Sequence, residues 1–449
     1  MFESSVATTL GSSEGAIKLL ISIFTGYLLA FLHRVPILYK APPTLKHVMF
    51  TVEGLALCYY NFGVDSIHVW LNVTFIYLVL LIFGGNKFTA VFTFVFNTAY
   101  LVMGYYYQIA FQEFGISWTM PLCVLTLRLT GVAFDFYDGQ KTPKGDKKQE
   151  SDAALTKRPG YLEMLGHTFF FGGILVGPQF SMRRYLAFVN GEYADEDSLA
   201  PKDSIVPGFR RLLLGIVYIA IFQLCALVLP NTYMVSEHFR EGAIIITGMS
   251  YNGRDEHGNR RWDACTNIKV WQLETGETFS DFIQSFNVNT NQWMLRYVHR
   301  RLRFLGNKML SQAITLFYLA LWHGLQSGYY MCFFLELLET KAELEFKSLL
   351  KGLIASGLLP DVESWGWASL LGRVVRKLTL LFLWSYALVA FALLDFDKWF
   401  PIYSSVFFIG HVMCAVAIAA SLAFRAISRP SPKANGVHVE KKAECKRTE

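Results

Sequence analysis

Long hydrophobic segments recur along the chain and alternate with short polar stretches. Four of them, residues 66–86, 88–112, 309–335 and 399–424, contain no Lys, Arg, Asp or Glu. A helix of about 20 apolar residues spans the ~30 Å hydrocarbon core of a bilayer, so each segment predicts a membrane helix. Weaker or interrupted candidates cover residues 19–32, 54–63, 116–134, 164–182, 212–229 and 378–394. The pattern predicts an all-α fold, a polytopic membrane bundle of about nine to eleven transmembrane helices.

The composition agrees with a membrane protein. Hydrophobic residues make up 53% of the 449 positions, charged residues make up 17%, and the mean hydropathy is +0.33. Soluble domains carry about 25% charged residues. No internal repeat or Pro-rich linker divides the chain, so we expect a single domain over residues 1–449. The seven cysteines form no CxxC pair and indicate separate thiols, and no metal site is expected.

The net charge of +6 is concentrated at two places. The loop 138–159 contains Lys141, Lys144, Lys147, Lys148, Lys157 and Arg158, and a basic tail starts at about residue 425. Short basic segments beside membrane helices favour the cytosolic side, so we expect both to be cytosolic. The lipid bilayer is the expected partner of these two basic segments, and their position beside it explains their charge. We therefore expect no nucleic-acid partner.

Residues 291–307 form a basic segment. Apolar residues recur there at helical spacing, and between them lie Arg296, His299, Arg300, Arg301 and Arg303. This pattern predicts an amphipathic helix at a membrane surface. Two roles stay open for its arginines. They anchor the helix to lipid headgroups, or some, such as Arg296 and Arg300, bind the phosphates of a diffusible anionic substrate.

His323 is the most informative single residue, because it lies near the centre of the uncharged segment 309–335. Ionisable groups at that depth are costly and are often functional. The alternative is a neutral histidine that hydrogen-bonds between two packed helices. Position by itself does not decide between these two roles.

The residues around His323 form a motif. They read Trp322-His323-Gly324-Leu325-Gln326-Ser327-Gly328-Tyr329, followed by Phe333. This resembles the WHGxxxGYxxxF signature of the lysophospholipid branch of the membrane-bound O-acyltransferase family. Other motifs similar to that family's occur in order: Trp262-Asp263, Asn287 at the family's asparagine position, Tyr386…Phe391, and Tyr403…His411 with Phe407 in place of a second Tyr. The WD and YxxxxF matches are weak singly, whereas the WHG block and the order are specific.

The resemblance, which covers about residues 15–425, implies a helical bundle with an intramembrane reaction tunnel that meets at His323. It implies catalytic roles for His323 and Asn287, with acyl-CoA as co-substrate and no cofactor. The substrate-binding candidates are Trp322, Gly324, Tyr329, Trp262, Asp263, Pro178, Phe180, Arg296 and Arg300. Among them, Pro178 and Phe180 belong to a Gly-Pro sequence that breaks a membrane helix and either widens the tunnel or only kinks the helix.

The sequence departs from the family in one place. After segment 212–229 the chain passes from Glu237 almost directly to Gly242, where another membrane helix is expected. The helix count and topology around residues 230–245 therefore stay open.

The residues also suit the chemistry. Acyl transfer from a thioester to an alcohol needs a base, and a neutral imidazole such as that of His323 suits this role at about pH 7. It also needs a donor for the developing oxyanion or a group that holds the acceptor, and the Asn287 amide can do either. The hydroxyl attacks the thioester directly, so no protein nucleophile is required. The HxxxxD pairing of soluble glycerolipid acyltransferases is absent from the chain.

We therefore expect an endoplasmic-reticulum enzyme that moves a fatty acyl group from acyl-CoA to the free sn-2 hydroxyl of a lysophospholipid. Lysophosphatidylcholine is the first candidate, and lysophosphatidylserine, lysophosphatidylethanolamine and lysophosphatidylinositol are alternatives. A transporter or a non-catalytic lipid-binding protein is a different class, but transporters more often carry intramembrane carboxylates, which the clearest spans lack. The acyl-chain preference and the oligomeric state, including a homo-oligomer, stay open.

Overall fold

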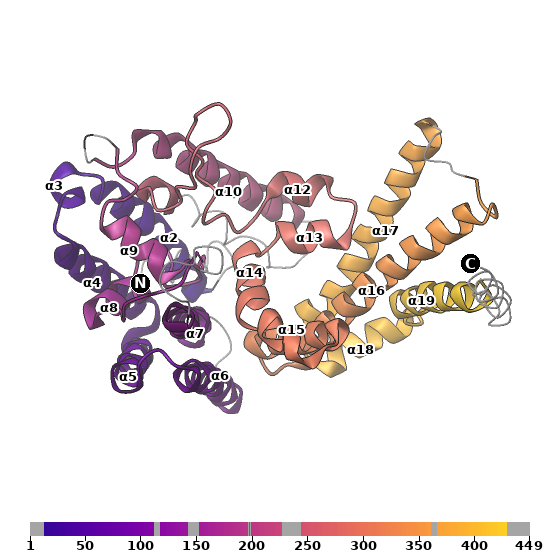
Figure 1. Cartoon of the computed structure of the whole chain (residues 1–449), viewed down its shortest axis with the longest axis horizontal. Helices are drawn as coiled ribbons and strands as arrows, with labels where there is room; N and C mark the ends of the chain where they lie inside the picture. Colours follow the sequence, from indigo (N-terminus) through magenta and orange to yellow (C-terminus); the bar gives the residue numbers. More distant parts are fainter. Residues whose placement is uncertain are drawn as a thin grey trace, which may run out of the picture. The chain divides into compact units, whose positions relative to one another are not determined.

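The computed structural model describes residues 13–111, 117–141, 152–195, 197, 199–226, 244–360 and 366–428. Their regular structure is helical, apart from one isolated β-bridge between Arg254 and Arg260, so the all-α prediction is confirmed. The chain forms two compact units, whose helices are labelled in Figure 1. The first unit comprises Met1–Gly276 and Asp281–Leu325, and the second comprises Glu277–Ser280 and Gln326–Glu449. The expectation of a single domain stays a prediction.

The first unit contains most of the helices. They begin with α2 Glu14–Leu32, α3 Pro36–Tyr39, α4 Pro43–Phe62, η1 Gly63–Ser66, α5 Ile67–Phe83, α6 Lys87–Ala110, α7 Thr119–Lys141, α8 Tyr161–Thr168 and α9 Met182–Val189. They continue with η2 Lys202–Ser204, α10 Ile205–Ala226, α12 Val270–Thr275, α13 Phe279–Ser285, α14 Val288–Tyr297, η3 His299–Leu305 and α15 Lys308–His323. The first two residues of α13 belong to the second unit. The other helices of the second unit are α16 Ser327–Ala355, α17 Gly366–Leu393, α18 Phe396–Ser405 and α19 Ile409–Ile427.

Six described segments are long and apolar enough to cross a membrane: Glu14–Leu32, Pro43–Phe83, Lys87–Ala110, Thr119–Lys141, Ser369–Leu393 and Ile409–Ile427. The predicted polytopic membrane fold is therefore confirmed, although six is fewer than the expected number. Three predicted spans differ from expectation. Segment 309–335 is divided between α15 and α16, segment 399–424 is divided between α18 and α19, and segment 164–182 is not one continuous helix. The helix expected near residues 230–245 falls mostly on residues 227–243, outside the described residues.

Buried Arg128 of α7 explains why α8 ends at Thr168. Its guanidinium donates to the carbonyl oxygens of the last two residues of α8 and of Gly173, at 2.8–3.1 Å. The last carbonyl groups of a helix lack partners within it, and Arg128 supplies them here. Gly54 of α4 leaves room for the chain that follows, because a Cβ at this position would lie 1.7 Å from the Phe169 carbonyl oxygen. The chain therefore leaves the helix and continues in irregular structure.

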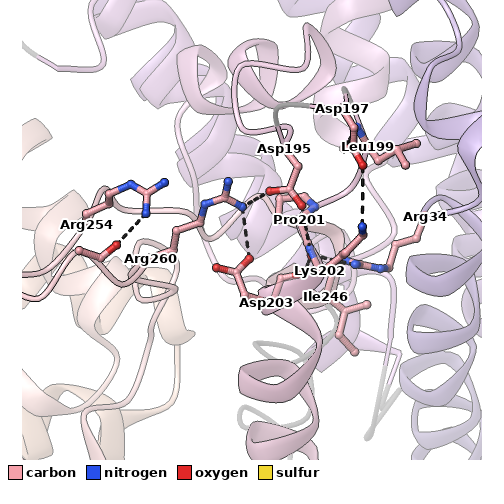
Figure 2. A network of polar contacts seen from close by, with 12 residues as sticks. Arg34, Asp195, Asp197, Leu199, Pro201, Lys202, Asp203, Ile246, Arg254 and Arg260 are labelled. Carbon is pink, nitrogen blue, oxygen red and sulfur yellow. Dashed lines mark hydrogen bonds and ion pairs between the residues drawn. The ribbon is translucent and has the colours of Figure 1, made fainter.

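Charged residues join loop 195–204 to turn 252–261 in the first unit. Figure 2 shows Arg260 paired with Asp195 and with Asp203. Arg34, which follows α2, adds hydrogen bonds of 2.6–2.7 Å to three acceptors, Ser204 Oγ and the carbonyl oxygens of Ile246 and Pro201. The network thus joins the segment that precedes α10 to the segment that begins at residue 244.

In the second unit, α16 packs against α17 and α19. Gly328 at the start of α16 permits a close approach, since a Cβ there would lie 2.1 Å from the carbonyl oxygen of Ala390. The hydroxyl of Tyr386 and Nδ1 of His411 are hydrogen-bonded at 2.8 Å, and the Tyr403 hydroxyl donates to the Tyr386 carbonyl at 2.8 Å. The two C-terminal motifs of the sequence therefore meet, and His411 has a packing role.

Candidate active site

Asn287 directly precedes α14 and has the left-handed backbone angles φ 47° and ψ 43°. Asparagine is several-fold enriched in this conformation among residues other than glycine. The side chain is half-buried, and its Oδ1 accepts a hydrogen bond from Nδ2 of Asn267 at 3.4 Å. Its own Nδ2 makes no hydrogen bond to any residue that the structure describes. One end of this amide is therefore held by the protein, and the donor end is available.

The two neighbouring asparagines behave differently from this first one. Nδ2 of Asn289 donates to the carbonyl oxygen of Cys265 at 3.2 Å. Nδ2 of Asn291 donates to the carbonyl oxygens of Ile283 at 2.6 Å and Phe286 at 2.9 Å. Both amides therefore stabilise the backbone of the loop, and their donors are already used.

His323 is the last residue of α15. Gly324 follows with φ 153° and ψ −174°, a backbone region that is essentially reserved for glycine. Glycine at this position lets the chain leave the helix directly after the histidine. The prediction that His323 lies inside a continuous membrane helix is therefore wrong, because the chain turns at the residue that the motif places next to it.

Trp322 fixes the end of α15. Its indole Nε1 donates to the carbonyl oxygen of Cys123 in α7 at 3.0 Å, and the hydroxyl of Tyr105 in α6 donates to the Trp322 carbonyl at 2.6 Å. The indole and imidazole rings of Trp322 and His323 meet edge to face, with centroids 4.8 Å apart. Trp322 thus acts as a support for the imidazole of His323.

The two predicted catalytic residues lie on helices that pack together in the first unit, α14 and α15 (Figure 1). Trp293 of α14 stacks on Tyr318 of α15, with centroids 6.3 Å apart. Asn287 precedes Trp293 by six residues, and His323 follows Tyr318 by five. Both residues therefore lie within about two helical turns of this contact.

The Trp262-Asp263 pair braces the turn that precedes the Asn267 segment. The ring of Trp262 is buried, and its centroid lies 5.7 Å from that of Tyr251. Asp263 accepts hydrogen bonds from Asn252 at 2.7 Å and Arg261 at 2.8 Å. Burial by itself raises the pKa of Asp263, but these two donors hold it below its usual range. These contacts assign a bracing role to Asp263.

Tyr329 lies in the second unit, where its ring packs edge-on against Phe391, with centroids 4.9 Å apart. Phe333 contacts the same ring at 6.3 Å. The C-terminal half of the WHGxxxGYxxxF motif therefore packs on the YxxxxF motif. A substrate-binding role for Tyr329 stays a prediction.

A cavity of about 640 Å³ lies in the first unit, a size typical of small-molecule sites. Its walls come from α7, from residues 152–157 and 179–193, and from α14. Phe180 and Arg296, two of the predicted substrate-binding residues, line it. Pro178 is not among the lining residues, and Arg300 is exposed on η3. Arg296 and Arg300, which the sequence analysis grouped together, therefore differ, because only Arg296 lines the cavity.

Cations outnumber carboxylates among the charged residues that line the cavity: Arg128, Lys157, Arg183, Arg184 and Arg296, against Asp135, Asp152 and Glu192. Lys157 and Arg183 form no ion pair with a carboxylate in the described ranges. Arg184 donates to the carbonyl oxygens of Met249 and Tyr251 at 3.2 and 2.9 Å. Arg128, Lys157, Arg183 and Arg184 were not among the site residues predicted from the sequence. The pair Arg183-Arg184, which starts five residues after Pro178, was a usable signal.

The basic segment 291–307 is not one amphipathic helix. It comprises the end of α14 and the 3-10 helix η3, with the break at Val298. Arg301 pairs with Asp138 of α7, so it holds η3 on the bundle. The Tyr297 hydroxyl donates to Asp135 at 2.7 Å and attaches the end of α14 to the same helix. Individual arginines of this segment thus have different roles.

Residues 11–15 show the spacing GxSxG that can present a serine nucleophile. The Oγ of Ser13 is the N-cap of α2 and accepts a hydrogen bond from the Ala16 amide at 3.2 Å. Serine is among the preferred residues at this position. The geometry therefore supports a capping role for Ser13.

Comparison with known proteins shows similarity to one family. The model of the MBOAT, membrane-bound O-acyltransferase family, matches residues 102–237 and 226–351. The chain is 39% identical to lysophospholipid acyltransferase 5 of Bos taurus, over 91% of this chain and 89% of that protein. It is 34% identical to lysophospholipid acyltransferase 5 of Drosophila melanogaster, over 90% and 86%. It is 24% identical to membrane-bound glycerophospholipid O-acyltransferase 2 of Mus musculus, over 89% and 83%.

Proposed function

Because the chain belongs to the membrane-bound O-acyltransferase family and is a multi-pass lysophospholipid acyltransferase, we propose that its preferred acceptor is lysophosphatidylcholine. Segments 177–182, 261–271 and 303–312 support this acceptor, because they resemble lysophosphatidylcholine acyltransferase type three within the family. We place the enzyme in the endoplasmic-reticulum membrane. Acyl-CoA and the lysophospholipid are its two substrates.

The observation that carries the proposed site is the end of α15. Gly324 terminates the helix, and Trp322 ties that end to α6 and α7. In our proposal, the imidazole of His323 accepts the proton of the sn-2 hydroxyl while its oxygen attacks the thioester carbonyl carbon. Nδ2 of Asn287 donates a hydrogen bond to the resulting oxyanion. When the intermediate collapses, the C–S bond breaks and the CoA sulfur takes the proton from the imidazolium.

The cationic cavity is our proposed site for the anionic end of acyl-CoA. The phosphates of CoA need cations, and Lys157 and Arg183 have no carboxylate partner in the described part of the chain. Arg296 lines the same cavity from α14, the helix that Asn287 precedes. An acyl-CoA bound there would approach the reacting groups from the side of residues 152–157. The charge of the lining supports this orientation.

A turnover assay tests the proposed function. Purified protein in lipid nanodiscs is supplied with labelled acyl-CoA and with lysophosphatidylcholine, lysophosphatidylserine, lysophosphatidylethanolamine or lysophosphatidylinositol in separate reactions. We expect the highest kcat/KM with lysophosphatidylcholine. A higher value with another headgroup would replace the acceptor but keep the reaction. Binding of acyl-CoA without product from any acceptor would favour a non-catalytic lipid-binding protein instead.

A further inference from the structure

We propose that Asn267 is a positioning residue that turns the amide of Asn287 so that its Nδ2 donors face the reacting carbonyl. The inference rests on the proposed function, in which Asn287 stabilises the oxyanion. It assigns a role to a residue that was not among the predicted site residues, although it lies within segment 261–271. Asn267 lies 20 residues before Asn287, and its side chain is only 7% exposed.

Asn267 holds the start of α14 by three contacts. Its carbonyl oxygen accepts from the Val288 amide at 2.9 Å, and its Oδ1 accepts from the Asn289 amide at 3.0 Å. Its Nδ2 donates to Oδ1 of Asn287 at 3.4 Å. One asparagine thus contacts three consecutive residues of the loop. The first two contacts fix the backbone, and the third reaches the catalytic side chain.

These contacts determine which way the Asn287 amide points. A side-chain amide has one acceptor end and one donor end. The Asn289 backbone amide can only donate, so the Asn267 atom that faces it must be the oxygen. The nitrogen of Asn267 then faces Asn287, and an N–H donor requires an acceptor there. Oδ1 of Asn287 is therefore directed toward Asn267, and Nδ2 of Asn287 is left for the substrate.

An acceptor in place of the Asn267 donor would reverse the Asn287 amide. Asn267→Asp keeps the size of the side chain, an oxygen for the Asn289 amide and the backbone contact to Val288. It replaces the donor to Asn287 with a carboxylate oxygen, which accepts from Nδ2 instead. The amide of Asn287 then turns its oxygen toward the oxyanion and repels it. One lost oxyanion donor lowers the rate by about 10²–10³.

The test compares Asn267→Asp with wild type in nanodiscs, using labelled acyl-CoA and lysophosphatidylcholine. We expect kcat to fall on the order of 10², with KM for both substrates within about threefold. The loss should shrink relative to wild type when the pH is lowered from about 8 to about 6, because a protonated carboxyl can donate to Asn287 again. In the Asn287→Gly background, Asn267→Asp should cause no further loss of kcat. A merely structural role predicts neither the pH recovery nor the missing second loss.

Asn291→Asp is the matched control, because it removes an amide that donates to the carbonyl oxygens of Ile283 and Phe286. It should lower thermal stability and change kcat per folded molecule by only a few-fold at either pH. If Asn267→Asp does not fold, Asn267→Ser keeps the backbone contact and should lose about tenfold in kcat without pH recovery. Two results would overturn this inference and leave the proposed function standing. One is a wild-type kcat in either Asn267 variant. The other is a loss of kcat from Asn267→Asp that is as large in the Asn287→Gly background as in the wild-type background. No product from wild type with any lysophospholipid overturns the proposed function as well.

Discussion

Two polar regions of the first unit use similar side chains in opposite ways. In the network of Figure 2, Arg260 faces Asp195 and Asp203, and Arg34 has three oxygen acceptors. In the cavity, Lys157 and Arg183 have no ion-pair partner among the described carboxylates. The first region satisfies its charges with protein groups. The second leaves cations on the wall of a 640 Å³ space.

The difference separates charges that hold the fold from charges that can bind a ligand. A buried guanidinium stabilises a structure when its donors are matched, and its removal then leaves acceptors without partners. A cation on a cavity wall contributes little to folding and is free to meet an anion. The loop 285–291 shows the same contrast among amides. Nδ2 of Asn291 donates to two loop carbonyls, whereas Nδ2 of Asn287 has no acceptor among the residues that the structure describes.

The largest expected effect is that of His323→Ala, which removes the proposed base. We expect kcat to fall by about 10²–10⁴, with expression and membrane insertion unchanged. His68→Gln is the control, because His68 bonds to Tyr100 at 2.7 Å and stacks on Trp118. The His68→Gln substitution should lower the stability of the protein and leave kcat within a few-fold of the wild-type value. More than about a tenth of wild-type turnover in His323→Ala contradicts the base assignment.

Asn287→Gly is the next test, because glycine keeps the left-handed backbone and removes only the amide. We expect kcat to fall by about 10²–10³ with the fold intact. Asn287→Asp should fail too, since a carboxylate repels the oxyanion. Asn289→Ala and Asn291→Ala should lose much less kcat per folded molecule. The measurement is kcat at saturating acyl-CoA, with folded protein quantified by thermal unfolding. Equal losses at all three positions would mean that the loop needs only its fold.

The cavity cations should affect acyl-CoA more than the lysolipid. Combined substitution Lys157→Gln, Arg183→Gln and Arg296→Gln is expected to raise KM for acyl-CoA by about tenfold or more, because charge-assisted contacts are lost. KM for lysophosphatidylcholine should change much less, and the difference should shrink at high salt. Arg300→Gln with Arg303→Gln is the comparison, because both side chains are exposed on η3. A larger rise in the KM for acyl-CoA from the Arg300 and Arg303 substitutions would mean that the CoA phosphates bind at η3 and not in the cavity.

Local patterns in the sequence predicted part of this structure well. The uncharged segments 66–86 and 88–112 predicted α5 and α6 correctly, because this signal lies in consecutive residues. The WHG block pointed to His323 in the same way, and the catalytic role of His323 stays a prediction. The sequence did not reveal that α15 ends at His323, since the residues stay uncharged from Gly324 to Leu335. Glycine is tolerated inside membrane helices, so its presence does not predict a break.

Other features depended on residues far apart in the chain. Segment 164–182 was predicted as a span because its own residues do not show where α8 ends. The residue that accounts for this end is Arg128, which donates to the last carbonyl groups of α8 and lies about 40 residues earlier in the chain. The role of Asn267 depends on a contact across 20 residues. The cavity combines α7, residues 152–157, α9 with its flanking residues, and α14. Tertiary contacts of this kind leave no periodic signal in the sequence.

The smallest expected effect on activity comes from Asp195→Asn, which breaks the polar network of Figure 2. Burial by itself raises the pKa of Asp195, but hydrogen bonds from Arg260 and the Lys202 amide hold it below its usual range. A depressed folded-state pKa stabilises the protein above the unfolded pKa of about 3.9, and this stability is lost as the pH falls through the folded-state pKa. Asp195→Asn should therefore lower the unfolding free energy near neutral pH by roughly 1.5–3 kcal/mol. It should also flatten the loss of stability below about pH 4.

The measurement is thermal unfolding of wild type and Asp195→Asn in the same detergent across that pH range, with turnover recorded on each sample. Arg254→Gln is the control, because Arg254 is exposed and donates to the Gly258 carbonyl at 2.7 Å within the same turn. It should leave the melting temperature almost unchanged. If the charges of this network only hold the fold, Asp195→Asn has a lower melting temperature than wild type. At temperatures where the variant is folded, its kcat and both KM values stay within about twofold of wild type. A selective rise in KM for acyl-CoA, with an unchanged melting temperature, would instead place this network in ligand binding and remove the distinction between the two regions.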